Sequence, residues 1–489
     1  MGKEKAKTKK KVSTFTRTLC FIALIILGAF LYVIYKLNVL PIKYFYYISI
    51  GLGILWFIYF LISLNRKLKV GVLIVVNILA LIFMTGELYA TSKIYRAYDF
   101  LNNGLQVTST KDIYYVVVNK DSSYNSKSDI KNKTVYYFND VDNVDDLKSV
   151  VTKRLKVNLK EVENYYDLFD KILEDTDKII LINSGSYDAL IENEEKYKDS
   201  LKKIDEIEFE KILESINNKD NIMNKPFTVY LSGIDTRENA MPSRSLSDVN
   251  MFIVVNPETK KILMVNIPRD YYVQLHGTKG LKDKLTHAGI LGGLNLSKST
   301  VEDILGTKAD YYVRVNFNSV VRLVDAVGGI TINSDVNYSF RCWTDRSCLF
   351  KPGANKVGGK CALAFARERH AYSSGDRHRG ENQQQVIKLV VDKLASSKSL
   401  VQNYDEILKA LEGTFESNLS TENITSVVQF QLNDMPSWEF VTSNLDGTGG
   451  NEPTYSYPNS VLSIMYPKTE TIEAAKAKIQ EVLNETEED

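Results

Sequence analysis

Three long apolar runs open the chain, and short polar segments separate them. They cover residues 18–37, 44–64 and 70–89, and none carries a charge at its centre. A helix needs about 20 residues to cross the ~30 Å hydrocarbon core of a bilayer, so each run is long enough to span a membrane. A cleaved signal peptide is the alternative for the first run. It is disfavoured because two more runs follow at once and no small-residue cleavage site precedes them.

Basic residues around these runs predict their orientation. The tail of residues 1–17 is rich in lysine, the second short loop carries Arg66, Lys67 and Lys69, and the first loop is poorer in basic residues. Because cytoplasmic loops carry an excess of Lys and Arg, the tail and the second loop are predicted to be cytoplasmic. Three spans, over residues 18–90, then place everything after about residue 90 outside the cell.

Residues 98–215 alternate between β-branched runs and amphipathic segments. Strands are predicted at 112–118, 133–138 and 177–182, and helices at 143–155 and, highly charged, at 187–204. Such alternation is typical of a small α/β domain. It carries no catalytic constellation, which favours an accessory or partner-binding role.

Residues 226–489 form a larger α/β domain. A buried strand ends at Asp235, and strands at 251–256 and 261–270 flank the turn PETK, which predicts a hairpin. A strand at 311–317 and a helix ending at Gly328 follow, and the tail adds two strands and a helix from Thr471. In such folds, ligand sites gather at the carboxyl ends of strands.

The net charge argues against nucleic-acid binding, and the positions of the cysteines indicate their expected states. The formal net charge is +1, so no global field attracts nucleic acid. Cys342 and Cys348 flank a polar stretch, and outside the cell a local disulfide between them is expected. Cys361 is expected to be a small buried apolar residue. The spacing of Cys and His does not fit a zinc site.

Arginine is concentrated in one part of the chain. The sequence has 46 Lys but only 15 Arg, and 11 of these Arg lie between residues 237 and 379. Because a guanidinium fork binds phosphate oxygens in a bidentate manner, this distribution indicates a phosphate site. Arg379 and Gln383 are four apart at the start of a predicted helix, where free N–H groups also favour anions. Arg367, Arg369 and Asp376 lie close by in sequence; the alternative is a solvated basic turn.

Carboxylates follow the predicted strands. Asp235 ends the first strand, Asp248 precedes the second and Asp270 ends the third. Beside an arginine-lined phosphate site they suit Mg²⁺, which prefers oxygen ligands; the alternative for each is a turn or cap residue. His370 and His378 lie near the arginines and could transfer protons, although structural roles are the default.

These residues stand in motifs that resemble the LytR-CpsA-Psr family. The matching segments are LSGID (231–235), SLSDVNMFIVVNP (245–257), VNIPRD (265–270), KLTHA (284–288), VNFNSVVRLVDAVGGI (315–330) and ALAFARERH through GENQQQVI (362–387). The resemblance covers residues 226–489. The three spans, with the unit at 98–215 as an accessory domain, are similar to capsule-type CpsA members.

The resemblance implies an α/β/α domain with a central mixed sheet and an apolar tunnel for a polyprenyl tail. It assigns diphosphate binding to Arg269, Arg367, Arg369, Arg379 and Gln383, catalytic roles to Arg269, Arg367 and Asp376, and Mg²⁺ to Asp235 and Asp248.

The function it implies is a phosphotransferase that moves a polyprenyl-diphosphate-linked glycopolymer, foremost capsular polysaccharide, to peptidoglycan at the cell membrane. Other capsule-assembly proteins are expected partners, and nucleic acid is not. A polyprenyl-diphosphate hydrolase and a non-enzymatic membrane regulator or scaffold are the alternatives.

Overall fold

The computed structural model divides into two compact units, which are Met1–Gly104 with Asn218–Met223 and Ser420–Pro436, and Leu105–Asn217 with Asn224–Leu419 and Ser437–Asp489. It describes residues 2–38, 40–65, 67–100, 109–138, 144–162, 165–193, 197, 199–212, 221–234, 241–396, 404–411, 414–458 and 460–486.

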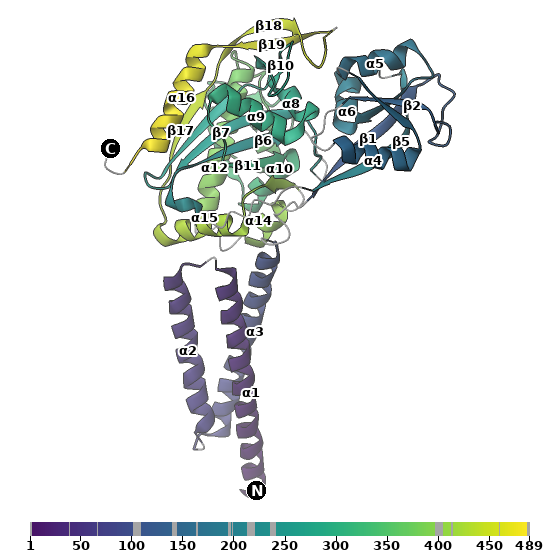
Figure 1. Ribbon diagram of the computed structural model, residues 1–489. Coiled ribbons are helices and arrows are strands. Elements are labelled where there is room, and N and C mark those ends of the chain that lie inside the picture. Colours follow the sequence, from purple (N-terminus) through teal and green to yellow (C-terminus); the bar gives the residue numbers. More distant parts are fainter. Residues whose placement is uncertain are drawn as a thin grey trace. The chain divides into compact units, whose positions relative to one another are not determined.

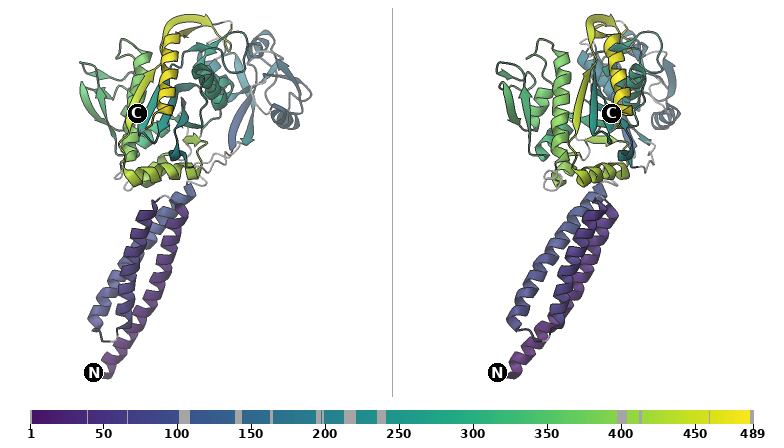
Figure 2. Two further views of the ribbon diagram at one scale, coloured as in Figure 1. Left: turned by 60° about the vertical axis from the view of Figure 1, so that its left-hand side comes forward. Right: turned by 90° about the vertical axis from the view of Figure 1, so that its left-hand side faces the viewer.

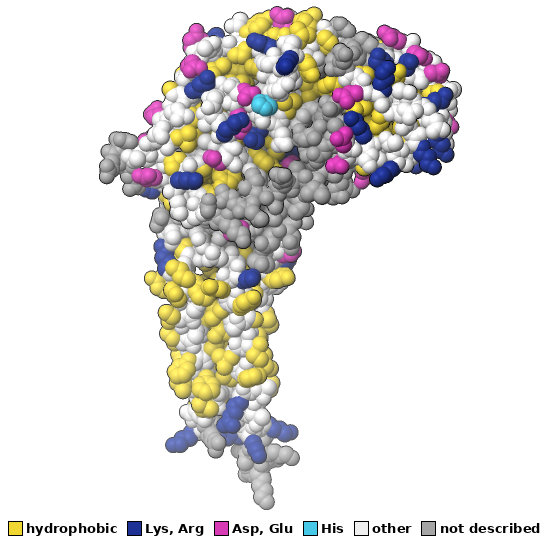
Figure 3. Space-filling model, in the orientation of Figure 1, with side chains coloured by type: hydrophobic (Ala, Val, Ile, Leu, Met, Phe, Trp, Pro, Cys, Tyr) yellow, Lys and Arg dark blue, Asp and Glu magenta, His cyan; other side chains and the backbone are white. Residues whose placement is uncertain are grey.

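Three long helices make up most of the first unit. They are α1 (Gly2–Leu37), α2 (Ile42–Leu64) and α3 (Val70–Asp99), and they lie side by side (Figures 1 and 2). Thr8–Leu37, Ile42–Leu64 and Val70–Arg96 are long and apolar enough to cross a membrane, so the chain is membrane-anchored. Apolar side chains cover the outside of the helices, and Lys and Arg gather at the end near the N-terminus (Figure 3).

Polar side chains link these helices on the inside of the bundle. The Trp56 indole donates to Glu87 at 2.7 Å, and the Tyr59 hydroxyl donates to Asn77 at 2.9 Å. Buried polar groups need such partners because unmade hydrogen bonds are costly away from water. The unit also contains α15 (Thr421–Asp434), which starts with a capping box at Ser420 and Asn423.

The second unit begins with a five-stranded sheet in the order β3-β2-β4-β1-β5. Its strands are β1 (Ser109–Asn119), β2 (Thr134–Phe138), β3 (Asn158–Val162), β4 (Ile179–Asn183) and β5 (Leu201–Ile212), with α4 (Val144–Leu155), α5 (Tyr165–Glu174) and α6 (Ser184–Asn193) beside them. Strand β1 runs antiparallel to β4 and β5, while β2 runs parallel to β3 and β4. The α/β prediction is confirmed.

The predicted charged helix at 187–204 is wrong over its last residues, 201–204. Helix α6 ends at Asn193, and β5 begins at Leu201 and pairs with β1. Lys203 explains how a charged segment becomes a strand, since its ammonium lies 3.5 Å from the centre of the Tyr115 ring and 4.3 Å from that of Tyr187. Pairing and packing with β1 override the local helical propensity.

A six-stranded mixed sheet forms the centre of the larger domain, in the order β16-β11-β6-β7-β8-β17. Its strands are β6 (Phe227–Ile234), β7 (Ser247–Asn256), β8 (Lys261–Ile267), β11 (Tyr311–Asn316), β16 (Phe415–Ser417) and β17 (Glu439–Asn444). The pairs β11–β6 and β17–β8 are parallel and the others are antiparallel. The predicted hairpin at 251–270 is confirmed as β7–β8.

Helices cover both faces of this sheet (Figures 1 and 2). On one face, α9 (Gly293–Leu305) and α16 (Thr469–Asn484) pack against Tyr230, Phe252 and Leu263. On the other face lies α12 (Asp376–Ala395), whose Gln384 amide donates to the Met264 carbonyl at 3.0 Å. The predicted α/β/α architecture with a mixed central sheet is confirmed.

One hydrophobic cluster joins the five-stranded sheet and its helices to the larger domain. Phe169 of α5 and Tyr187 of α6 share it with Ala288 of α8 (Leu285–Leu291). A buried ion pair crosses the same junction, where the Arg244 guanidinium lies 4.0 Å from Asp112 on β1. Arg244 belongs to the segment that leads into β7, so the smaller domain contacts the approach to Asp248.

Candidate active site

Two strand ends place a carboxylate and a guanidinium group side by side. Asp248 is the second residue of β7, and Arg269 lies two residues beyond the end of β8, after Pro268. The Arg269 Nη1 donates to Asp248 Oδ1 at 2.8 Å. Asp270 pairs with Lys284 at 2.5 Å. The antiparallel pairing of β7 with β8 therefore builds one side of the site.

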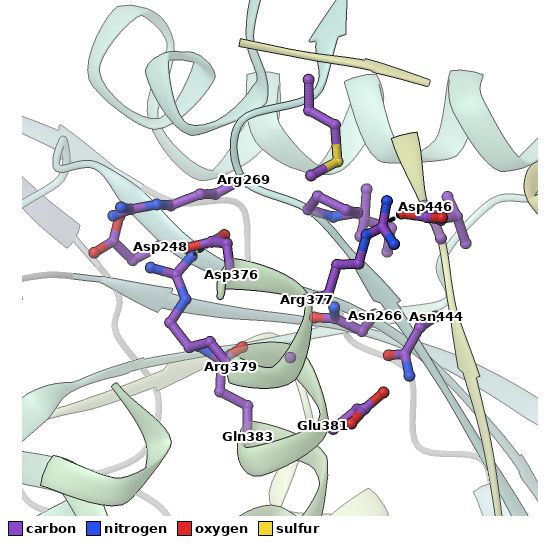
Figure 4. A pocket seen from close by; sticks show the side chains of 15 residues that line it. Asp248, Asn266, Arg269, Asp376, Arg377, Arg379, Glu381, Gln383, Asn444 and Asp446 are labelled. Carbon is purple, nitrogen blue, oxygen red and sulfur yellow. Dashed lines mark hydrogen bonds and ion pairs between the residues drawn. The ribbon is translucent and has the colours of Figure 1, made fainter. Parts of the chain in front are cut away.

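The first turns of α12 supply the opposite side. Asp376 is its first residue, and its Oδ2 accepts from Arg379 Nη2 at 2.9 Å. Gly375 precedes the helix with φ +56°, a conformation that favours glycine. Arg379 and Gln383 are both buried, one helical turn apart, as their spacing predicts. Figure 4 shows Asp376 between Arg269 and Arg379.

Arg367 and Arg369 follow α11 (Gly359–Ala366) and are held by a residue that sequence reasoning missed. Glu368 is 1% exposed. Its carboxylate accepts from the backbone N–H groups of Arg369 at 3.0 Å, His370 at 2.6 Å and Ala371 at 3.1 Å. It also accepts from the N–H of Trp343. In the sequence, Glu368 is only an acidic residue between two arginines, a pattern that is equally typical of a surface ion pair.

These side chains meet around two neighbouring cavities. The larger, of about 340 Å³, has mostly apolar walls with arginines among them, formed by Leu231, Gly233, Asp248, Val249, Arg269, Val315, Asn316, Phe317, Val320, Trp343, Thr344, Leu363, Ala366, Arg367, Arg369, His370, Arg379, Gln383, Val386 and Ile387. The smaller, of about 210 Å³, is more polar and is formed by Asp248, Asn266, Ile267, Pro268, Arg269, Asp376, Arg377, Arg379, Gly380, Glu381, Gln383, Asn444, Leu445, Asp446 and Met465.

The structure thus brings together every predicted site residue that it describes. Arg269, Arg367, Arg369, Arg379, Gln383 and Asp248 all line the larger cavity, and Asp376 lines the smaller one. Asp235, the other predicted Mg²⁺ ligand, lies outside the described residues. The roles assigned to these residues stay predictions.

The electrostatics of the site favour an anion. Burial lowers the pKa of Arg379, and the neighbouring positive charge of Arg269 lowers it further. For Arg269, burial is outweighed by the carboxylates of Asp248 and Asp270, which raise its pKa above the ordinary value. An anionic ligand would relieve the repulsion between the two guanidinium groups, since opposite charge favours the charged form.

A divalent cation fits this chemistry in part. Among the described residues, no group of three His, Cys, Asp or Glu side chains is arranged to hold a metal ion. Asp248 nevertheless presents a carboxylate at both cavities. Strand β6 pairs with β7 up to Ile234 opposite Ser247, so the chain leaves β6 beside Asp248. Mg²⁺ needs only one or two protein carboxylates when substrate phosphates supply other oxygens.

The predicted disulfide between Cys342 and Cys348 is wrong. Cys348 is bonded to Cys361 on α11, with Cα atoms 5.4 Å apart, while Cys342 is a buried free thiol. The hairpin of β13 (Phe340–Arg341) and β14 (Leu349–Phe350) does bring Cys342 beside Cys348. Packing of α11 against this hairpin decides the pairing, and Cys361 is therefore not merely a small apolar residue.

The two nearby histidines are held by aromatic and acidic neighbours. His370 lies against Trp343 with ring centres 4.6 Å apart. His378 stacks on Tyr372 at 3.5 Å and lies 3.2 Å from Glu381. Of the two, only His370 lines one of the two cavities described above, and its part in proton transfer stays a prediction.

Comparison with known proteins points to one family. A model described as the LytR_cpsA_psr family matches residues 184–475. The polyisoprenyl-teichoic acid–peptidoglycan teichoic acid transferase TagU of Enterococcus faecalis is 35% identical over 232 residues, which is 47% of this chain and 74% of that protein. Biofilm regulatory protein A of Streptococcus mutans is 34% identical over 211 residues, 41% of this chain and about half (52%) of that protein. A crystal structure of Bacillus subtilis TagV aligns with a TM-score of 0.45 and 27% identity, covering 54% of this chain and 98% of that one.

Proposed function

The chain belongs to the LytR-CpsA-Psr family, and from that premise we propose that it transfers a glycopolymer from a polyprenyl diphosphate carrier to peptidoglycan. A relative at 35% identity is named as a transferase that joins a polyisoprenyl-linked teichoic acid to peptidoglycan. The three apolar helices tether the chain to the bilayer in which such a carrier resides.

The observation that carries this proposal is the composition of the larger cavity. Four arginines, Arg269, Arg367, Arg369 and Arg379, share it with a wall of Leu, Val, Ile and Phe side chains. A polyprenyl diphosphate has the same two parts, a charged head and a hydrocarbon tail. Guanidinium groups bind phosphate oxygens, and burial of each methylene of the tail stabilises binding by roughly 0.8 kcal/mol.

The residues of the site divide the work of phosphoryl transfer, which depends mainly on positioning and charge neutralisation. The arginines hold the diphosphate, while Asp248 and Asp376 fix the guanidinium groups of Arg269 and Arg379. We propose that Mg²⁺, held by Asp248 together with Asp235, supplies further neutralisation of phosphate charge when bound.

The polymer and the orientation of the anchor are part of the same proposal. The three-helix anchor with an accessory domain favours capsular polysaccharide as the polymer, with teichoic acid as the competitor.

Lys67 and Lys69 lie on the loop between α2 and α3, which predicts a cytoplasmic loop and an extracellular site. Protease added to intact cells should then cleave the chain after residue 100, and full protection would contradict this orientation.

The transfer reaction itself tests the proposal. Full-length chain in liposomes would be given a lipid-linked glycan labelled in its sugar, together with soluble peptidoglycan chains. The label should move to peptidoglycan. Label released as free polymer would show a hydrolase, and label left on the lipid would favour a scaffold.

Arg367→Ala should reduce this transfer about tenfold to a hundredfold, since it removes charge-assisted bonds of about 1.5–3 kcal/mol. Arg154→Ala is the matched control, because Arg154 is an exposed arginine of α4 that pairs with Asp205 and lines neither cavity. Equal transfer by both variants would contradict the assignment of Arg367.

A further inference from the structure

We infer that the smaller, polar cavity binds the acceptor sugar of peptidoglycan, and that the attacking hydroxyl reaches the diphosphate from this side. The inference rests on the proposed transfer function. It assigns to one place in the fold the acceptor site that the proposed function requires.

The two cavities meet at three of the residues that would hold the diphosphate, together with Asp248. Asp248, Arg269, Arg379 and Gln383 line both of them. Beyond this common wall the larger cavity is lined mainly by apolar side chains, whereas the smaller one has two amides and three carboxylates beside Arg377 and four apolar side chains. A diphosphate at the common wall therefore has a hydrocarbon environment on one side and a polar one on the other.

The geometry of phosphoryl transfer assigns a ligand to each side. The attacking and leaving oxygens lie roughly in line, on opposite sides of the phosphorus. The leaving group is polyprenyl phosphate, and its tail requires the apolar cavity. The acceptor must then approach from the polar cavity.

The polar cavity is built to recognise neutral polar groups. Asn266 and Asn444 are direct neighbours on the parallel strands β8 and β17, at the ends of these strands. Figure 4 shows them together, apart from the group formed by Asp376, Arg269 and Arg379. Each amide offers donors and an acceptor, which suits the hydroxyl and N-acetyl groups of peptidoglycan sugars.

The remaining charges of this cavity have partners, so it presents little free positive charge to a phosphate. Arg377 lies 2.5 Å from Asp446 and donates to the Gly447 carbonyl at 3.0 Å. Helix α12 packs directly against the Asn266 amide at Gly380, which has no side chain. A Cβ at Gly380 would come within 2.2 Å of Asn266 Nδ2. Asn444 is exposed and remains available to a ligand.

The acceptor hydroxyl oxygen forms a bond to the phosphorus next to the sugar. The bridging P–O bond breaks, and its electron pair stays with polyprenyl phosphate. The hydroxyl proton passes to Asp376, whose Oδ1 is buried and has no hydrogen-bond partner among the described residues.

Separate titration of donor and acceptor tests the inference. The full-length chain in liposomes would receive a lipid-linked disaccharide diphosphate as donor and soluble peptidoglycan chains as acceptor. Asn444→Ala and Glu381→Ala should each raise the KM for the acceptor about tenfold, the loss expected for one hydrogen bond. Binding of the donor, measured directly, should stay within about twofold of the wild type.

Phe317→Ala is the matched control from the larger cavity, where the Phe317 ring lies 4.2 Å from the Arg367 guanidinium. It should weaken donor binding without raising the acceptor KM. An unchanged acceptor KM in both polar variants would overturn the inference, and so would a loss of donor binding, which would instead place the donor sugar there. A wild-type chain that binds no donor would overturn the proposed function itself.

Discussion

At the scale of single residues, the site depends on carboxylates that hold arginines in position. Asp248 holds Arg269, Asp376 holds Arg379, and Glu368 holds the turn that carries Arg367 and Arg369. The arginines could be predicted from the sequence because Lys is the default cation of this chain. The role of Glu368 could not, because its four partners are backbone N–H groups that become neighbours only in the folded turn.

Glu368→Ala should destabilise the chain and impair donor binding together. The substitution leaves buried N–H groups without an acceptor, and each such group costs about 1–3 kcal/mol. Glu368→Gln keeps one carbonyl acceptor and should recover part of the loss. Thermal unfolding and donor titration of both variants would measure this. An alanine variant with wild-type stability and affinity would refute the positioning role.

Arg379→Lys should lower donor affinity about tenfold although it retains a positive charge. The guanidinium presents a planar fork, whereas an ammonium is a point charge. Burial and the nearby Arg269 already disfavour the charged form at this position, and a lysine there would lose its proton more readily than usual. The affinity of the lysine variant should therefore fall further as the pH rises above neutral. Full affinity at all pH values would show that charge alone suffices.

At the scale of elements, one covalent bond ties the hairpin beside the larger cavity to helix α11. The Cys348–Cys361 bond closes a loop with a sequence separation of 13. Cys361→Ser should reduce the free energy of unfolding by about 2–4 kcal/mol, as is typical for a disulfide of this kind. Cys342→Ala removes only a free thiol and is the control. Equal stability of the Cys361→Ser variant and the wild type in unfolding experiments would show that the bond contributes little.

Elements determined by local sequence features could be predicted, and elements determined by tertiary contacts could not. The length of the apolar runs predicts α1 to α3, and the local turn chemistry of PETK predicts the β7–β8 hairpin. Strand β5 was missed because its charges match a helical surface, and only pairing with β1 makes it a strand. The disulfide was misassigned because the position of α11 against the hairpin has no signature in cysteine spacing.

At the scale of the whole molecule, buried carboxylates predict how stability depends on pH. Glu302 is buried, yet its pKa is lowered from 4.5 because hydrogen bonds from Lys298, Lys308 and the Ala309 N–H outweigh burial. Asp270 is likewise held below 3.8 by Lys284 and Arg269 against the effect of burial. Both groups stabilise the fold above these ordinary values, and the contribution is lost as the pH falls through the lowered ones.

The temperature of unfolding should therefore fall as the pH drops below about 4. Glu302→Gln should lower this temperature near neutral pH and flatten its decline in acid. A decline as steep as that of the wild type would show that other groups dominate acid unfolding.

The fate of the two phosphates tests the central claim most directly. A lipid-linked donor carrying radioactive phosphorus only in the phosphate next to the sugar would be incubated with full-length chain and peptidoglycan. Attack at that phosphorus predicts that the label enters peptidoglycan as a phosphodiester, while unlabelled polyprenyl phosphate is released. Label recovered on the lipid or as inorganic phosphate, with polymer attached to the wall, would contradict the account.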